Sequence, residues 1–329
     1  MKRYFFLVFL AFLGGMQAVQ GEQTTGRAEW LHDARWGVFT HYMADTVLAA
    51  EDLSIESWNA AVDSFDVGAL ANLLERTGAG YYVITLGQNS GYYCSPNRAY
   101  DKHTGIRPSK CSRRDLVADL YDVLHPKGIR LMVYLPSGAP DRDAEAVKAL
   151  GWQRGRDGPD ARLASFQRKW EEAIREWSLR WGPKVAGWWF DGCYYADLMY
   201  NHAEEPNFAS FAAAARAGNP EAVVAFNPGV KQPIITVTPE EDYTAGEIND
   251  VLKVRCGGRF VGQAQYHMLS YLGQRWAAGP PRFSEADAVD ATLAVVEKGG
   301  VVSWDVPIEA DGAIPAPFAK QLIAIGKGL

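Results

Sequence analysis

Short runs of strand-forming residues alternate with amphipathic helical stretches along most of this chain. Apolar side chains recur at helical spacing within residues 67–76, 115–124, 164–180 and 285–298. Strands that alternate with helices build βαβ units and a parallel sheet, and no dinucleotide-binding Gly-x-Gly-x-x-Gly motif follows the first run. The pattern therefore predicts an α/β protein, a TIM-like (β/α)8 barrel, with strands at residues 36–41, 81–86, 131–135, 187–191, 223–227, 243–247, 260–265 and 301–306.

The first residues have the parts of a secretory signal peptide. Lys2 and Arg3 form a basic start, an apolar run covers residues 4–13, and small and polar residues follow up to Gly21. We therefore expect residues 1–21 to be a signal peptide and residues 22–329 to form one domain of a secreted or periplasmic protein. No later stretch reaches the ~18 apolar residues of a membrane helix, so we expect no membrane anchor.

The charge balance and the spacing of metal-binding residue types disfavour several classes of partner. The 33 Lys and Arg against 39 Asp and Glu give a net charge of −6, which argues against nucleic acid. The six His and four Cys lack the spacings of zinc sites, so we expect neither a metal nor a cofactor. Cys94 and Cys111 are the pair that we expect to form a disulfide after export. Homo-oligomerisation stays open.

Polar and aromatic residues gather at the carboxyl ends of the expected strands. The active sites of (β/α)8 barrels form at that end, so these residues are the candidates for a site. Carboxylates among amides and aromatic rings are typical of a pocket that cleaves sugars, which needs one carboxylate as nucleophile or base and one carboxyl as acid. The candidates are His41, Gln88, Asn89, Tyr134, Trp189, Asp191, Asn227, Glu247, Gln263, Trp304 and Asp305.

Asp191 is the strongest single candidate, because it ends the apolar run at residues 185–190. An ionised carboxylate there costs several kcal/mol unless it is paired or functional, although a helix-capping role is an alternative. Glu247 is either catalytic or a solvated loop acid. For Asp305 we favour a structural hydrogen bond to a neighbouring loop, and His41 could equally be a core histidine.

Five segments resemble, in the same order, the α-L-fucosidases of glycoside hydrolase family 29. The resemblance implies a barrel catalytic domain in which Asp191 is the nucleophile and His41 binds the sugar. It extends over about residues 30–327 and rests on RWGVFTHY at 35–42, AGYYVIT at 79–85, DLV to KGIRLMVY within 115–134, WWFDG at 188–192, and VVEKGG to DGAIP within 295–315.

The sequence departs from the family pattern at the expected sugar pocket and at its end. Gln88 and Asn89 stand where the family usually has a His-His pair, and Asn227 is not followed by the family's common Arg. Many members continue into a β-sandwich, whereas this sequence ends at Leu329, so we expect the catalytic domain alone, with no C-terminal β-sandwich.

The acid/base residue is a Glu whose position varies among family members. Matching SYLG at residues 270–273 places Gln263 or Gln265 near that Glu, and Gln cannot donate the catalytic proton. Glu247 is therefore the first choice for the acid/base, and Asp305 is the second.

Together these interpretations predict an exported retaining exo-glycosidase that removes terminal α-L-fucose or a related sugar from a carbohydrate. Asp191 would attack and Glu247 would transfer the proton, while Trp189 and Trp304 would wall the apolar face of the sugar. Two alternatives stay open: a glycosidase of different specificity, for a galactoside or a sulfated sugar, and a catalytically inactive sugar-binding barrel. The remaining candidates would bind the sugar: His41, Gln88, Asn89, Tyr134, Asn227, Gln263 and Asp305.

Overall fold

The computed structural model describes residues 22–153, 162–251 and 254–329, and the expected signal peptide lies outside them. The helices are α1 Glu22–Ala34, α2 Ala44–Val47, α3 Ile55–Ser64, α4 Val67–Thr77, α5 Arg98–Thr104, α6 Leu116–Leu124, α7 Ala144–Leu150, α8 Ala164–Trp181, α9 Ala196–Met199, α10 Phe208–Ala215, α11 Glu285–Val296 and α12 Ala316–Gly328. The strands are β1 Trp36–Thr40, β2 Tyr81–Thr85, β3 Arg130–Pro136, β4 Gly187–Asp191, β5 Val223–Phe226, β6 Phe260–Val261, β7 Ala264–Gln265, β8 His267–Tyr271, β9 Gly273–Arg275, β10 Ala278–Pro281 and β11 Val301–Val306.

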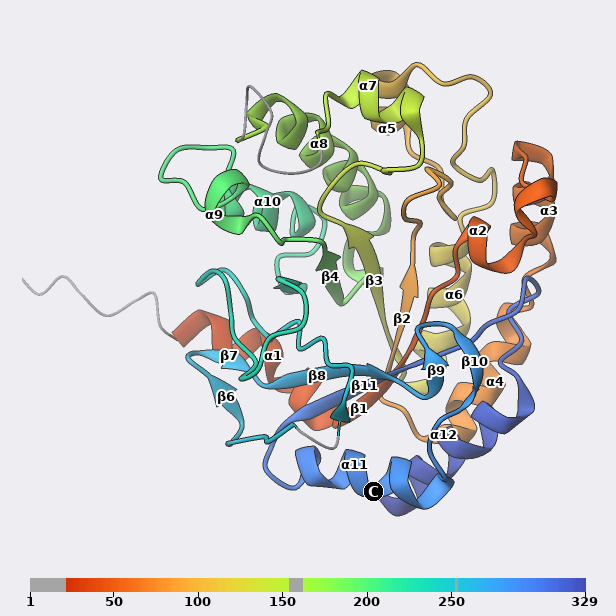
Figure 1. Ribbon diagram of the computed structural model, residues 1–329, viewed down its shortest axis with the longest axis vertical. Coiled ribbons are helices and arrows are strands. Elements are labelled where there is room, and N and C mark those ends of the chain that lie inside the picture. Colours follow the sequence, from red (N-terminus) through yellow and green to blue (C-terminus); the bar gives the residue numbers. More distant parts are fainter. Residues whose placement is uncertain (1–21, 154–161, 252–253) are drawn as a thin grey trace, which may run out of the picture.

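A curled parallel sheet forms the centre of the described chain, and helices surround it (Figure 1). Its seven strands follow the order β5-β4-β3-β2-β1-β11-β8, with every neighbouring pair parallel. Helices connect β1 to β2, β2 to β3, β3 to β4, β4 to β5 and β8 to β11, as βαβ units require, whereas the described part of the β5-to-β8 connection contains β6 and β7. All strand carboxyl ends therefore lie at one rim of the sheet.

Two of the eight predicted strands are wrong. Residues 260–265 form the antiparallel β6–β7 pair. The strand that joins the parallel sheet in this region is β8, which begins only at His267. Residues 243–247 make isolated bridges to the β7–β8 segment instead of a regular strand. The cause lies partly in Gly246, whose φ of +66° is left-handed and whose missing side chain lets His267 O approach closely. The result is a seven-stranded half-barrel, where the sequence predicted eight regular strands.

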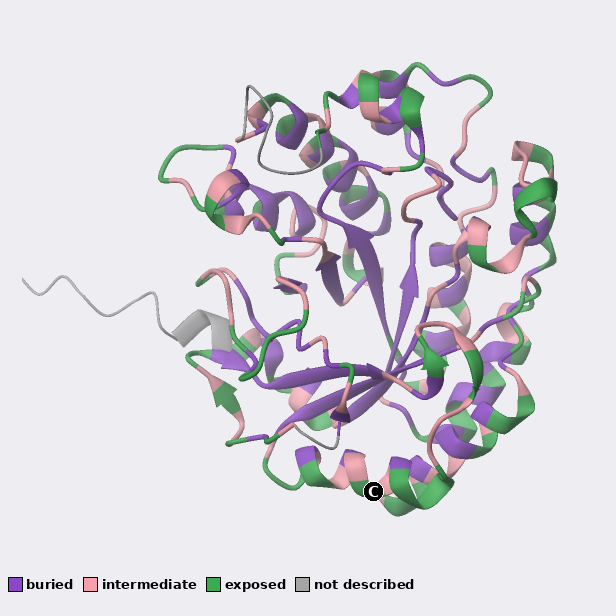
Figure 2. Ribbon diagram, viewed as in Figure 1, coloured by how far each residue is buried: buried purple, intermediate pink, exposed green. Residues whose placement is uncertain are grey.

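The central strands are buried along most of their length (Figure 2), and alternation sorts their side chains into two apolar clusters. Alternate strand positions such as Phe39, Tyr134 and Trp189 face the inside of the curled sheet, together with Leu31 of α1. Trp304 belongs to the larger cluster between sheet and helices. A residue at a strand end therefore reaches the interior rim only if it has the inward parity.

Side-chain caps and a glycine fix the ends of the helices beside the sheet. Asp66 caps α4 by accepting a hydrogen bond from the Ala69 N–H, and Asp115 caps α6 in the same way through Ala118 N–H. Gly78 closes α4 with a φ of +70°, which a residue without Cβ adopts at little cost. These caps hold the helices that connect β1 to β2 and β2 to β3.

The predicted Cys94–Cys111 disulfide is wrong, since all four cysteines are free and buried. Tyr93 pairs with Cys111 across a parallel bridge, so Cys94 points to the opposite face of its segment. There the Cys94 thiol donates to Thr85 O over 3.6 Å. In the described part of the chain, no helix combines the length and apolar character that crossing a bilayer requires.

Candidate active site

A cavity of about 400 Å³ opens at the carboxyl rim of the sheet. It receives Asp191 from the end of β4 and Glu247 from the segment that bridges to β8. Both residues have the inward parity of the interior cluster, which is why they reach the same space. Its other lining residues are His41, Met43, Asp45, Thr46, Gln88, Tyr134, Trp189, Tyr194, Leu269, Trp276, Ala277 and Ala278.

The Asp191 carboxylate is held by donors on both of its oxygens. Tyr134 donates its hydroxyl to Oδ2 over 2.7 Å, and Gln88 Nε2 donates to the same oxygen over 3.3 Å and contacts Tyr134 Oη. Asn227 Nδ2 donates to Oδ1 over 2.8 Å. Burial and the Asp191 charge raise the pKa of Tyr134, so this phenol stays a donor. Asp191 is thereby fixed in position while it remains half-buried at the cavity wall.

Asn227 connects the two catalytic candidates. Its Nδ2 also donates to Glu247 Oε2 over 2.7 Å, and its Oδ1 accepts the Gly229 N–H. Asp191 Oδ1 and Glu247 Oε2 lie 2.8 Å and 2.7 Å from Asn227 Nδ2, so these two oxygens can be no farther apart than the sum of the two distances. That limit falls in the range of about 5–5.5 Å for paired carboxyls of retaining glycosidases, and below the ~6.5 Å minimum of inverting ones.

Glu247 has the electrostatic setting of a general acid. Burial raises its pKa above the ordinary value, and the nearby Asp191 charge adds to the rise. The Asn227 hydrogen bond and His41 act in the opposite direction without cancelling it. A proton is therefore retained on Glu247 to higher pH than on a solvated glutamate.

His41 and Asp305 form a pair at the ends of β1 and β11. His41 Nδ1 bonds to Asp305 Oδ1 over 2.8 Å, and Asp305 Oδ2 accepts the Ala277 N–H over 2.7 Å. Burial by itself would lower the pKa of His41, but Asp305, Asp191 and Glu247 together raise it. Since Asp305 engages Nδ1, a ligand in the cavity would meet the other ring nitrogen of His41.

Asp305 makes the structural hydrogen bond to a neighbouring loop that the sequence analysis favoured. It does not line the cavity, where a substrate-binding or acid/base residue would have to lie. Its side chain is 0% exposed and both oxygens are engaged by His41 and Ala277. Asn227 is also fully buried, and its amide contacts the two carboxylates instead of the cavity. Asn89 does not line the cavity either, and its carbonyl accepts the Arg142 N–H.

The predicted sugar contacts of Trp304 and Gln263 are wrong. Trp304 has outward parity and is buried against α11, where its indole N–H donates to Thr292. Gln263 is exposed in the turn between β6 and β7, which precedes β8 and so lies at the amino end of the sheet. Gln265 is there too, bonded to Gly299 O, so neither Gln occupies an acid/base position. This removes the reason for expecting an inactive barrel.

The structure adds cavity residues that sequence reasoning missed. Trp276 lies in the β9–β10 hairpin and meets the His41 ring edge-on at 5.8 Å. Trp189 lines the same cavity and stacks on Tyr134. Trp276 follows the end of β8 at Tyr271, and it is too far from the end of the strand predicted at 260–265 to be recognised as a residue at a strand end. Asp45, in the short helix α2, was missed because it follows β1 by several residues.

Two carboxyl groups face the cavity between aromatic side chains, at the carboxyl rim of a parallel α/β sheet. This arrangement is that of a glycoside hydrolase. The family model described as alpha-L-fucosidase matches residues 53–329. The chain therefore belongs to the α-L-fucosidase family. Comparison with curated proteins found no match.

Solved structures share the fold at low sequence identity. An endo-fucoidan hydrolase of glycoside hydrolase family 107, MfFcnA4, superposes with a TM-score of 0.72 at 17% identity, over 94% of this chain and 54% of its own. The α-L-fucosidase of family 29 from Bacteroides thetaiotaomicron gives 0.64 at 16%, over 98% and 76%. AlfC from Lactobacillus casei, in complex with α-L-fucose, gives 0.63 at 15%, over 92% and 97%. The chain thus spans about half the length of the fucoidan hydrolase.

Proposed function

We propose that this protein is a retaining exo-glycosidase that hydrolyses terminal α-L-fucose, or a closely related neutral sugar, from a carbohydrate. The observation that carries the proposal is the Asn227 amide, which bonds to one oxygen of Asp191 and one of Glu247 and so keeps these oxygens closer together than the carboxyls of an inverting pair. Membership of the α-L-fucosidase family supports fucose as the sugar. We assign to residues 241–248 the place of an eighth barrel strand, because Glu241 and Asp242 bond to β5 while Gly246 and Ile248 bond to β8.

The reaction takes place in two displacements. Asp191 attacks the anomeric carbon, its new C–O bond forms as the glycosidic bond breaks, and Glu247 gives its proton to the leaving oxygen. Glu247 then takes a proton from water, which attacks the same carbon and releases Asp191 as a carboxylate. Tyr134 and Gln88 keep the Asp191 oxygens oriented, and His41 binds a hydroxyl of the sugar.

The test is a nitrophenyl α-L-fucoside, with the anomeric form of the first product followed by NMR. We expect nitrophenol release and initial formation of α-L-fucose, since two displacements at one carbon restore its configuration. Initial β-L-fucose would contradict the retaining mechanism. If the α-galactoside or another aryl glycoside turns over faster than the fucoside, the sugar assignment is wrong while the mechanism stands.

The charge of the cavity predicts rejection of sulfated sugars. Asp45, Asp191 and Glu247 line it, while His41, the lining residue that can carry positive charge, is paired with Asp305. Asp45 bonds to Arg142 through Oδ2, and in the described part of the chain its buried Oδ1 has no partner. A sulfate brought into this space meets the negative charge of Asp191 and that of Asp45, whose partner Arg142 is exposed.

We expect Asp45→Asn to raise kcat/KM for a sulfated aryl fucoside, relative to the neutral one, about tenfold. Removing one charge a few ångströms away in a half-buried cavity is worth on the order of 1–2 kcal/mol. The control is Asp52→Asn, an exposed acid nearby on the same loop. Equal selectivity in the two variants would refute the role of Asp45.

We also propose that residues 1–21 direct export and are removed. Sequencing the amino terminus of the protein purified from its native host tests this proposal. A start close to Glu22 is expected, and an intact Met1 would contradict it.

A further inference from the structure

The outer edge of β5 lacks the carbonyl partners of a regular neighbouring strand. In a parallel sheet, successive N–H groups of one strand point to opposite neighbours. The N–H groups of Val223 and Asn227 bond to Ala186 O and Phe190 O on the β4 side, at 3.0 and 2.7 Å. The N–H groups of Val224 and Phe226 therefore face the irregular segment on the other side.

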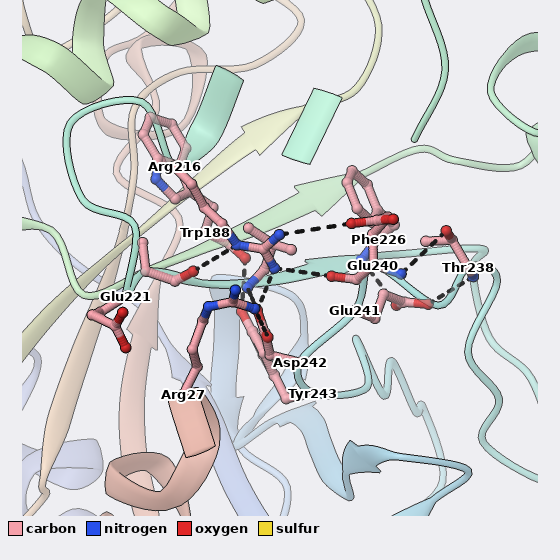
Figure 3. A network of polar contacts seen from close by, with 12 residues as sticks. Arg27, Trp188, Arg216, Glu221, Phe226, Thr238, Glu240, Glu241, Asp242 and Tyr243 are labelled. Atoms are coloured by element: carbon pink, nitrogen blue, oxygen red, sulfur yellow. Dashed lines mark hydrogen bonds and ion pairs between the residues drawn. The ribbon is translucent and has the colours of Figure 1, made fainter. Parts of the chain in front are cut away.

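Two carboxylates take the place of these carbonyls (Figure 3). Asp242 Oδ2 accepts the Val224 N–H over 2.9 Å, and Glu241 Oε1 accepts the Phe226 N–H over 3.0 Å. A main-chain bond from Asp242 N to Val224 O, at 3.0 Å, continues the same ladder. The side chains thus join β5 to a segment that does not pair with it as a strand.

The two carboxylates are balanced in different ways. Asp242 is 0% exposed and bonds to Arg216 over 2.6 Å and to Arg27 of α1 over 3.2 Å, so its charge is neutralised (Figure 3). Glu241 is 2% exposed and, within the described residues, forms no ion pair with Lys or Arg. It relies on three backbone N–H groups, from Phe226, Val237 and Thr238, the last two at 2.6 and 3.3 Å from Oε2.

Burying Glu241 in this way is costly. Burial raises its pKa to about 8, although the three N–H groups act to lower it. An apolar side chain at this position would avoid that desolvation cost, but it would leave the three N–H groups without their acceptor. The role of Glu241 therefore follows from what these bonds hold in place.

These bonds hold in place the Asn227 amide, which bonds to Asp191 and Glu247. Glu241 anchors the residue that immediately precedes Asn227, and the chain leading from Glu241 carries Glu247 at its end. On its other side, that chain bonds to β8 through Ile248 N to Leu269 O, at 2.9 Å. The position of Glu247 relative to Asn227 thus depends on the β8 bonds and on the carboxylate bonds to β5.

We propose that Glu241 is a positioning residue that keeps Glu247 within reach of Asn227, and so beside Asp191. Asp191 has a separate support, because Tyr134 and Gln88 hold its Oδ2 from β3 and the loop after β2. Loss of Glu241 should therefore displace the acid/base and spare the nucleophile. This inference rests on the proposed function for its kinetic test, but its structural test is independent of activity.

The kinetic test compares Glu241→Gln with Glu240→Gln, the same change at the neighbouring, half-exposed position. We expect Glu241→Gln to lower kcat/KM about 10- to 100-fold for an alkyl α-L-fucoside, whose leaving group needs the acid, and less than about threefold for the dinitrophenyl fucoside. The fall of kcat/KM at high pH should also move to lower pH. A displaced Glu247 lies farther from the Asp191 charge, which helps to raise its pKa in the wild type. Equal losses on both substrates, or no change, would overturn the proposal.

Two additions keep the test decisive. If Glu241→Gln does not fold, Glu241→Asp retains a carboxyl group but is too short to reach both Phe226 and Val237, and the same loss is expected. Crystal structures of the Glu241 and Glu240 variants test the positioning without turnover. We expect the Asn227–Glu247 bond to be lost only in the Glu241 variant, and its retention would refute the inference. A wild-type protein that cleaves neither fucoside would contradict the proposed function alone.

Discussion

Asp191→Ala is expected to lower the turnover of nitrophenyl α-L-fucoside roughly 10⁴-fold or more. Asp191 is the carboxylate that forms the glycosyl-enzyme, and removing such a nucleophile costs about as much as removing the whole catalytic set. The nitrophenol leaving group needs little acid assistance, so the loss reports the nucleophile and not Glu247. The measurement is nitrophenol release at matched protein concentrations.

The matched control is Asp197→Ala, an exposed acid in α9 shortly after the same strand, and its turnover should equal that of the wild type. Added azide should restore part of the activity of Asp191→Ala. Azide enters the space left by the carboxylate, its nitrogen bonds to the anomeric carbon as nitrophenolate leaves, and the product is the β-fucosyl azide. More than about a tenth of wild-type activity in Asp191→Ala would show that Asp191 is not the nucleophile.

Glu247→Gln is expected to produce a loss that depends on the leaving group. For an alkyl fucoside, kcat/KM should fall about 10²- to 10⁴-fold, the usual contribution of a general acid. For the dinitrophenyl fucoside, kcat/KM should change little, while kcat falls because no base activates water in the second displacement. Equal losses on the two substrates would assign Glu247 a structural role.

The pH dependence provides a second readout for Glu247. Its acid form is the active one for the first step, and it is lost as pH rises through the pKa. Because burial and the Asp191 charge raise that pKa, activity on the alkyl fucoside should persist to higher pH than an ordinary glutamate allows, and then fall. The fall should be absent in Glu247→Gln, whereas Glu240→Gln should keep it.

Most strands and helices could be predicted because their signals are local. The runs that became β1 to β5 and β11 are buried on both faces and lie between helices with clear caps. The errors fall in the region from residue 229 to 271, where Gly246 and the β6–β7 pair interrupt the alternation. Neither a strand period nor a helical period identifies such a segment.

Six of the eleven candidate residues line the cavity, and the other five lie elsewhere. Asp191, Glu247, His41, Gln88, Tyr134 and Trp189 line the cavity, because each follows or ends a strand with inward parity or reaches over the rim. Parity also explains the failure at Trp304, since the residue next to inward-facing Asp305 must point outward. This much follows from counting along a correctly placed strand.

The sequence by itself determined the alternation of strands and helices, the family, and which chemistry-bearing residues end the strands, because these depend on local periodicity and short motifs. Only the tertiary structure decided their relations: Asn227 between Asp191 and Glu247, Asp305 behind His41, and Glu241 in place of a backbone carbonyl. Such contacts join residues far apart in the chain, and they depend on the register and curl of the whole sheet, which no local pattern encodes.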